Sequence, residues 1–246
     1  MSTKLRLDQA LVARGLCPSR EQAQRLILAG EVKIGTRIAS KPSEKITADE
    51  LVELKEKPRF VSRGGLKLEG ALDTFHLNVE SMTCLDVGAS TGGFTDCLLQ
   101  RGAATVHAFD VGTNQLVWKL RNDPRVHSRE NFNCRRLTVD DVGEQVDLAV
   151  MDLSFISLLH VLPAVISCVR PGGSVIALIK PQFELTPAQI SKGGIVRDEA
   201  ARAEAVEKIR AWVQTQSHLT WASVIPSPIT GTDGNVEFLV WLQLAR

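Results

Sequence analysis

The sequence predicts a mixed α/β protein in which a small α+β module precedes a larger, doubly wound and mostly parallel sheet. Short apolar runs alternate with helical patterns from residue 84 onward, and a glycine-rich turn follows the first of these runs. Such alternation is typical of parallel strands joined by right-handed crossovers. The segment before residue 55 lacks it and has two short helical patterns followed by β-like pieces.

The charge of the chain changes along its length. Its 246 residues exceed the usual size of one domain, so we expect one large or two smaller domains. Residues 1–67 hold 14 Lys and Arg against 8 Asp and Glu, whereas the remainder holds 15 against 20. A basic head on an acidic body favours a polyanionic partner for the head, although a solvated basic face without a partner explains the charge equally well.

Five scattered cysteines without a C-x-x-C pair favour a reducing compartment and argue against a zinc site. The first residues have no apolar signal-peptide core, and no apolar run approaches the roughly 20 residues of a membrane span. We therefore expect a cytoplasmic protein with no membrane segment and no bound metal.

Residues 1–54 are predicted to form a small binding module. One helical stripe covers residues 5–11 and ends at Gly15. A second helix begins at Ser19, which is placed to cap it, and ends at Gly30. The module holds no residue that resembles a nucleophile, a metal ligand or an acid/base pair.

The pattern R-L-D-Q-A-L-V-x-R-G, followed by S-R-E-Q-A-Q-R-L-I-L-A-G-E-V-K-I, resembles the S4 RNA-binding domain from Lys4 to about Ile46. Such a surface binds structured RNA mainly by phosphate neutralisation and shape. The resemblance implies that Arg6, Ser19, Arg20 and Arg25 face RNA. The charges of Lys4 and Lys33 are free to lie on the same surface, and we also expect Arg63, beyond the linker, to bind RNA.

Residues 55–61 are polar and contain Pro58, which predicts a linker before a second domain at 62–246. Gly64 and Gly65 are expected to break the backbone ahead of a helix. Lys67 then falls near the N-terminus of that helix, where the helix dipole disfavours a cation. Without a resemblance to guide it, the sequence assigns Lys67 to the surface.

The stretch Thr83–Asp96, T-C-L-D-V-G-A-S-T-G-G-F-T-D, reads as a strand, a glycine turn and a helix start. Its glycines do not follow G-x-G-x-x-G, and no Lys-Ser or Lys-Thr follows them, so it is not a phosphate loop. An acidic turn suits a cationic adenosine cofactor, S-adenosylmethionine, with a purely structural turn as the alternative. On the first hypothesis the cofactor lies against Asp86, Gly88, Ala89, Ser90 and Gly92.

The remaining elements continue the alternation. Strands are expected at 84–87, 105–109, 126–128, 146–151 and 174–179, and helices at 94–99, 116–120, 158–169 and 200–213. Two final strands, 219–225 and 236–244, are joined by a connection too short for a helix, which predicts an antiparallel pair at the end of the sheet.

Three predicted strands end in an acid: Asp86, Asp110 and Asp152. Ligands of open α/β sheets lie beyond the carboxyl ends of the strands. A single acid there fits any polar strand exit, but three on one edge favour a site. Asp110 lies near the spacing typical of a ribose-binding acid. We expect Val111, Asn131 and Asp152 to bind the cofactor as well, with Asn131 toward the adenine.

Lys180 follows an apolar strand, so partial burial favours its neutral amine, and a second cation such as Lys67 would favour it further. A neutral amine can act as a general base on a hydroxyl. Glu237 lies on the last predicted strand and points either toward the same edge or outward to solvent.

Five segments, S-R-G-G-L-K-L, C-L-D-V-G-A-S-T-G-G-F-T-D, A-V-M-D-L-S-F-I-S, L-I-K-P-Q-F-E and T-D-G-N-V-E-F, resemble the TlyA-type members of the FtsJ-like ribose 2′-O-methyltransferases. The resemblance implies a Rossmann-like methyltransferase domain that methylates the 2′-oxygen of cytidine in ribosomal RNA. It also implies a catalytic tetrad at Lys67, Asp152, Lys180 and Glu237. Lys180 would align or deprotonate the ribose hydroxyl, and the other three would hold its charge and position.

Two alternatives stay open beside this enzyme. Some members of the family are called haemolysins, but the chain shows no signal peptide, span or strongly basic amphipathic helix. A methyltransferase fold without catalysis, acting as a ribosome- or RNA-binding factor, is the second alternative. The strand-end acids and both lysines favour the enzyme.

Overall fold

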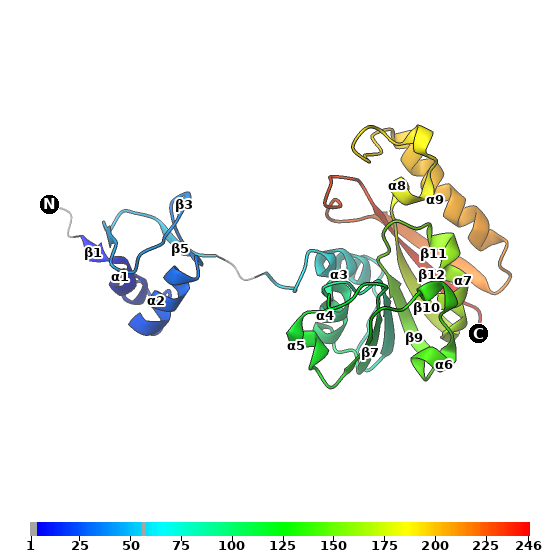
Figure 1. Cartoon of the computed structure of the whole chain (residues 1–246), viewed down its shortest axis with the longest axis horizontal. Coiled ribbons are helices and arrows are strands. Elements are labelled where there is room, and N and C mark those ends of the chain that lie inside the picture. The colour runs from blue at the N-terminus through cyan, green and yellow to red at the C-terminus, as the bar shows by residue number, and fades with distance from the viewer. Residues whose placement is uncertain (1–3, 56–57) are drawn as a thin grey trace. The chain divides into compact units, whose positions relative to one another are not determined.

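A computed structural model describes residues 4–55 and 58–246 of the chain (Figure 1). The chain divides into two compact units, residues 1–58 and 59–246. The division falls inside the stretch 55–61 that the sequence predicts as a linker, of which residues 56 and 57 lie outside the described part.

The first unit packs two helices, α1 (Leu7–Ala13) and α2 (Arg20–Leu28), against short strands. The strands form an antiparallel pair and a three-stranded sheet of order β3-β2-β5. Their bounds are β1 Leu5–Arg6, β2 Val32–Ile34, β3 Arg37–Ile38, β4 Lys45–Ile46 and β5 Val52–Leu54. Apolar side chains of both helices and of β2 make one buried cluster. The expected helical stripe begins too early, because Leu5 lies in β1 and is exposed.

Local chemistry fixes the ends of α2. The hydroxyl of Ser19 accepts a hydrogen bond from the backbone of Gln22, which satisfies one of the unpaired amides at the helix start. Gly30 adopts a left-handed conformation with φ 69°, which ends the helix as the sequence predicts.

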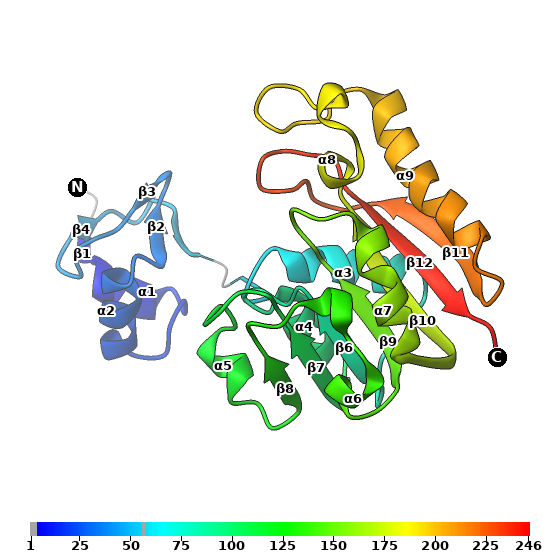
Figure 2. The same ribbon diagram turned by 45° about the vertical axis from the view of Figure 1, so that its right-hand side comes forward.

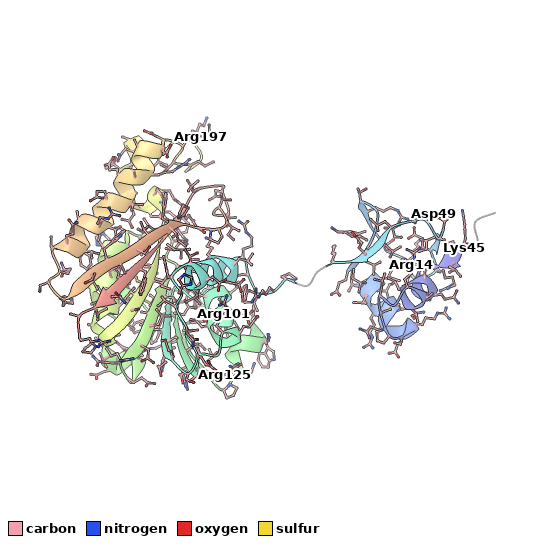
Figure 3. The ribbon with its side chains drawn as sticks, turned by 180° about the vertical axis from the view of Figure 1, so that it is seen from behind. Arg14, Lys45, Asp49, Arg101, Arg125 and Arg197 are labelled. Carbon is pink, nitrogen blue, oxygen red and sulfur yellow. The ribbon has the colours of Figure 1, made fainter. Side chains whose placement is uncertain are left out.

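Arg14, beyond α1, donates hydrogen bonds to the carbonyls of Thr47, Ala48 and Glu50 (Figure 3). Its guanidinium group therefore ties the end of α1 to the loop before β5.

The second unit contains a seven-stranded sheet of order β11-β12-β10-β9-β6-β7-β8. Strands β6 to β10 pair in parallel, and β12 is antiparallel to both of its neighbours, so β11 runs in the same direction as β10. The predicted parallel sheet with an antiparallel end is therefore confirmed. The bounds are β6 Thr83–Val87, β7 Thr105–Phe109, β8 Val126–Arg129, β9 Val146–Met151, β10 Val169–Ile179, β11 Leu219–Pro226 and β12 Phe238–Leu244.

Helices cover both faces of this sheet (Figure 2). Side chains of α3, α4 and α5 share one buried cluster with the sheet, and side chains of α6, α7 and α9 share the other. The helices are α3 Gly64–Thr74, α4 Gly93–Gln100, α5 Trp118–Arg121, α6 Val139–Val142, α7 Leu162–Ser167, α8 Pro181–Glu184 and α9 Glu199–Gln214, with short 3₁₀ turns at η1 Cys134–Arg136, η2 Leu158–His160 and η3 Pro187–Gln189.

Two expectations about this unit are wrong. Gly64 and Gly65 do not break the backbone but form the first turn of α3. A Cβ on Gly65 would collide with the ring of Phe60, so glycine at this position allows the helix to pack closely against that ring. The single helix expected over 158–169 is a 3₁₀ turn followed by α7. Strand β10 already begins at Val169 and shifts register before Ser174.

No helix in residues 4–55 or 58–246 is long and apolar enough to cross a membrane. The same described residues contain no group of three His, Cys, Asp or Glu side chains arranged to hold a metal ion.

Candidate active site

A cavity of about 750 Å³ opens at the carboxyl ends of the parallel strands in the second unit. Its walls come from the start of α3, the glycine turn after β6, and the loops that follow β9 and β10. The loop 227–237 between β11 and β12 completes it. The cavity therefore lies where an open α/β sheet places its ligand.

The glycine turn forms one wall of the cavity. Gly88 adopts φ 86° and donates its amide to the carbonyl of Phe109 at 2.8 Å. A Cβ at Gly88 would lie 2.6 Å from the backbone oxygen of Asp152, so only glycine allows these two strand exits to approach. Ala89 and Ser90 also line the cavity. Gly92, which directly precedes α4 and adopts φ 98°, packs against Leu120 instead.

Asp86 lies directly beneath this wall and is fully buried. One carboxyl oxygen accepts a hydrogen bond of 2.6 Å from the hydroxyl of Thr95, and the other has no partner among the described residues. Burial raises the pKa of Asp86 to about 7, and the nearby carboxylates of Asp152 and Asp110 act in the same direction. The unpaired oxygen of Asp86 can therefore interact favourably with a cation bound nearby.

Asp110 stands behind the turn, at the end of β7. Its two oxygens accept hydrogen bonds from the amides of Ser90, at 2.8 Å, and Gly112, at 2.6 Å. The bond to Ser90 joins β7 to the cavity wall. Val111 is exposed, and the backbone amide of Asn131 donates to the carbonyl of Gly112, so both of these predicted cofactor-binding residues border the same loop. Neither they nor Asp86, Gly92 and Asp110 contribute to the cavity lining itself.

All four predicted tetrad residues line the cavity, and they form two ion pairs. Lys67 Nζ lies 2.5 Å from Glu237 Oε2, with both side chains buried. Lys180 Nζ lies 2.7 Å from Asp152 Oδ1 and donates a hydrogen bond of 2.9 Å to Ser154 Oγ. The angle between Lys180 and Asp152 is poor for a hydrogen bond, so their attraction is mainly one of charge.

Sheet topology brings these residues together. Strands β9, β10 and β12 are neighbours in the sheet. Asp152 and Lys180 directly follow the parallel strands β9 and β10. Glu237 directly precedes β12, which runs the opposite way, so the start of β12 lies at the same edge as the ends of the other two. Glu237 therefore points inward to Lys67 on α3, which settles the choice between edge and solvent left open by the sequence.

The loop after β9 contributes two residues that sequence reasoning missed. Ser154 holds the Lys180 ammonium. Phe155 is 90% exposed, lines the cavity and adopts a left-handed conformation with φ 63°, which is unusual for an aromatic residue. Its ring centre lies 5.2 Å from that of Phe183 on α8. The motif D-L-S-F-I-S contained both residues but gave no sign of either role.

Glu184 and Asn235 brace the cavity loops from behind. The buried carboxylate of Glu184 accepts hydrogen bonds from the Ser157 hydroxyl, at 2.5 Å, and from the Leu158 amide, at 2.7 Å. It thereby holds the far end of the loop that carries Phe155. Asn235, also buried, accepts from the Val196 amide and donates to the carbonyl of Gly194, both at 2.9 Å. Side chains spaced far from their partners in sequence leave no pattern that predicts such bonds.

The bond pattern of Asn235 joins two loops, 185–198 and 227–237, that lie side by side in Figure 2. Arg63 donates a hydrogen bond of 2.6 Å to the carbonyl of Thr230 in the second loop. This predicted RNA-binding arginine belongs to the second unit and is exposed at the cavity. Arg197, in the first loop, is exposed before α9 (Figure 3).

The remaining predicted RNA-binding residues lie in the first unit. Lys4, Arg25 and Lys33 are exposed. The hydroxyl of Ser19 is engaged in capping α2. Two others, Arg6 and Arg20, both form ion pairs with the buried carboxylate of Asp8.

Comparison with known proteins defines the class of the molecule: residues 60–244 match the FtsJ-like methyltransferase model, and residues 5–52 match the S4 domain. The 16S/23S rRNA (cytidine-2′-O)-methyltransferase TlyA of Mycobacterium tuberculosis is 48% identical over 99% of this chain and 91% of its own. Hemolysin A of Brachyspira hyodysenteriae is 41% identical over 96% of this chain and 98% of its own.

A solved structure from Streptococcus thermophilus is 46% identical and covers all of this chain and 90% of its own, with a TM-score of 0.74. The chain therefore belongs to the TlyA-type members of the FtsJ-like methyltransferase family, as its motifs predict.

Proposed function

We propose that this protein transfers a methyl group from S-adenosylmethionine to the 2′-oxygen of a ribose in ribosomal RNA, at a cytidine. The observation that carries the proposal is the cavity in which the lysines 67 and 180, each paired with a carboxylate, face the glycine turn. The names of the relatives support the substrate, and the S4 domain supports RNA binding. Ribosomal subunits are the partners we propose, and a cytoplasmic location is part of the same proposal.

The cavity fits the cofactor on structural grounds. Gly88 has no side chain and so leaves room for a ligand against the backbone. The unpaired carboxyl oxygen of buried Asp86 can stabilise the positive charge of the cofactor. Backbone atoms of residues 88–90 would hold the cofactor, and Asp110 would accept its ribose hydroxyls through lone pairs not used by Ser90 and Gly112. Bound S-adenosylmethionine supplies an electrophilic methyl group on a positively charged sulfur.

Lys180 orients the attacking hydroxyl. Its ammonium group has three N–H bonds, of which one is directed to Ser154 and a second lies toward Asp152. The third is available to hold the ribose 2′-oxygen. Methyl transfer requires this oxygen to stand in line with the methyl group, so fixing its position supplies most of the catalysis. As the new oxygen–carbon bond forms, the hydroxyl proton would pass to Lys180 while Lys180 passes one of its own protons to Asp152, 2.7 Å away, so the amine gains no net proton.

Lys67 and Glu237 form the opposite side of the cavity. Because both are buried and paired, the Lys67 ammonium has a fixed position. It stabilises negative charge as it develops on the attacking oxygen. Glu237 keeps that ammonium in place and offsets its charge in the absence of substrate.

Phe155 provides an aromatic surface at the mouth of the cavity. A ribose inside a helix cannot enter such a cavity until its nucleotide leaves the stack. An exposed ring supported by Phe183 compensates for the lost stacking of the base. Base stacking would account for an aromatic residue that is exposed to solvent and held in a left-handed backbone conformation.

The test is methyl transfer from labelled S-adenosylmethionine to isolated 30S and 50S ribosomal subunits. We expect label at a ribose 2′-oxygen with the wild type, and a rate at least about 100-fold lower with Lys180→Ala. Lys119→Ala is the matched control, because Lys119 is exposed and lies outside the cavity lining. Subunit binding by the wild type without label would overturn the enzyme and favour a binding factor.

A further inference from the structure

Asp8, in the first turn of α1, is the only acid of the described first unit whose side chain is fully buried. Five hydrogen bonds end on its carboxylate. They come from Arg6 through Nε and Nη2, from Arg20 through Nε, from the side chain of Gln24, and from the backbone of Gln9, at distances of 2.8 to 3.1 Å. Residues of β1, α1 and α2 thus converge on one carboxylate.

The bonds to Asp8 leave the outer parts of both guanidinium groups unused. Among the described residues, Arg6 Nη1 and both Nη atoms of Arg20 have no hydrogen-bond partner. The side chains are 37% and 52% exposed, so these N–H groups face solvent. Two guanidinium groups fixed to one carboxylate stand next to each other, although their charges alone would drive them apart.

The carboxylate is held in its charged form. Burial alone raises the pKa of Asp8, but the hydrogen bonds from Arg6, Gln24 and Arg20 outweigh it and hold the pKa well below its usual range. The cluster therefore keeps one negative and two positive charges, with the positive charges on the outside.

We propose that Asp8 is a positioning residue that fixes Arg6 and Arg20 side by side as one binding site for a phosphate of the substrate RNA. A guanidinium group binds phosphate through paired N–H bonds, and a side chain that is already ordered loses less entropy on binding. The inference rests on the proposed RNA substrate. From its negative charge alone, Asp8 would be expected to repel a phosphate and weaken RNA binding.

Other basic residues of the unit differ in this respect. Arg14 donates hydrogen bonds to three backbone carbonyls of its own unit (Figure 3). Arg25 pairs with Glu21 one turn away at 3.6 Å, and both side chains are largely exposed, so neither holds the other firmly. Glu21 therefore offers a matched control: an acid beside an RNA-facing arginine that does not fix its position.

The experiment measures binding of the full chain to isolated 30S and 50S subunits over a range of salt concentrations, for wild type, Asp8→Asn and Glu21→Gln. Each substitution removes one negative charge from a basic surface. Electrostatics alone predicts tighter binding for both. We expect tighter binding only for Glu21→Gln, and binding about tenfold weaker for Asp8→Asn. The slope of log affinity against log salt becomes shallower by about 1 for Asp8→Asn, because a phosphate contact is lost.

A second variant guards against a folding defect. Arg20→Lys keeps the charge but loses the planar fork, and it is expected to weaken binding as Asp8→Asn does. Circular dichroism of all variants checks that the helices persist. Equal tightening by Asp8→Asn and Glu21→Gln in folded protein would overturn the inference, as would wild-type affinity for Arg20→Lys. Weakened binding by Asp8→Asn, in a protein that transfers no methyl group, would support the inference while the proposed enzyme failed.

Discussion

The ion pair between Lys67 and Glu237 makes a strong prediction about stability. The two charged groups lie 2.5 Å apart, with only 9% and 3% of their side chains exposed. Glu237→Gln keeps the size of the side chain but leaves a buried ammonium without a counter-charge, which is expected to destabilise the fold by about 3 to 5 kcal/mol. Glu21→Gln, which breaks an exposed pair, is expected to change stability by less than about 1 kcal/mol.

Urea unfolding followed by tryptophan fluorescence measures both effects. The double variant Lys67→Met/Glu237→Gln removes the stranded charge, so we expect it to regain most of the lost stability, to within about 1 to 2 kcal/mol of wild type. Methyl transfer is expected to stay lost in the single and double variants, because the proposed chemistry needs the ammonium. A double variant as unstable as the sum of its single variants would refute the reasoning, since it would show no coupling across the pair.

Three further predictions concern the walls of the cavity. Gly88→Ala is expected to destabilise by about 3 kcal/mol in urea unfolding, whereas Gly143→Ala, which also has a positive φ but open space around its Cβ, costs about 1 kcal/mol; equal effects would contradict the close approach. Burial raises the pKa of Asp86 from 3.8 to about 7, so the folded protein keeps a proton that the unfolded chain releases, and wild-type stability falls as pH rises between these values. Asp86→Asn should flatten urea-unfolding stability over that window, and an unchanged slope would count against the raised pKa. Asn235→Ala leaves the buried Val196 amide unpaired, so hydrogen exchange at residues 190–197 is expected to accelerate and the KM for ribosomal subunits to rise, with the cofactor Kd unchanged; unaltered exchange would exclude the brace.

The sequence predicts the parts of the site whose signals are local. The strand and glycine turn at 83–93 are adjacent in sequence, and their apolar run and glycines define them together. Asp152 and Lys180 each follow a buried apolar strand. Because parallel strands end at the same edge of a sheet, this pattern alone predicts that the two side chains lie close together. The S4-like and methyltransferase-like motifs led to a family that the comparisons confirm.

Residues whose partners are distant could not be predicted from local pattern. Lys67 looks like a surface residue until Glu237, 170 positions away, is seen against it, and only the resemblance to a family singled it out. Asp8 and Asn235 gave no signal, because a single acid or amide in a helix or loop is common and its partners are set by packing. The catalytic roles of the four tetrad residues stay a prediction that the geometry makes testable.

The position of β12 has a consequence for biosynthesis. This strand is made last of the seven, yet it lies between β10 and β11 rather than at an edge. Until it leaves the exit tunnel, β10 has an unpaired side, β11 has no neighbour in the sheet, and Glu237 is absent from Lys67. A nascent chain therefore carries the glycine turn and both lysines before the sheet beneath the cavity is complete. The seven-stranded sheet and the Lys67–Glu237 ion pair are therefore completed only after β12 has been made.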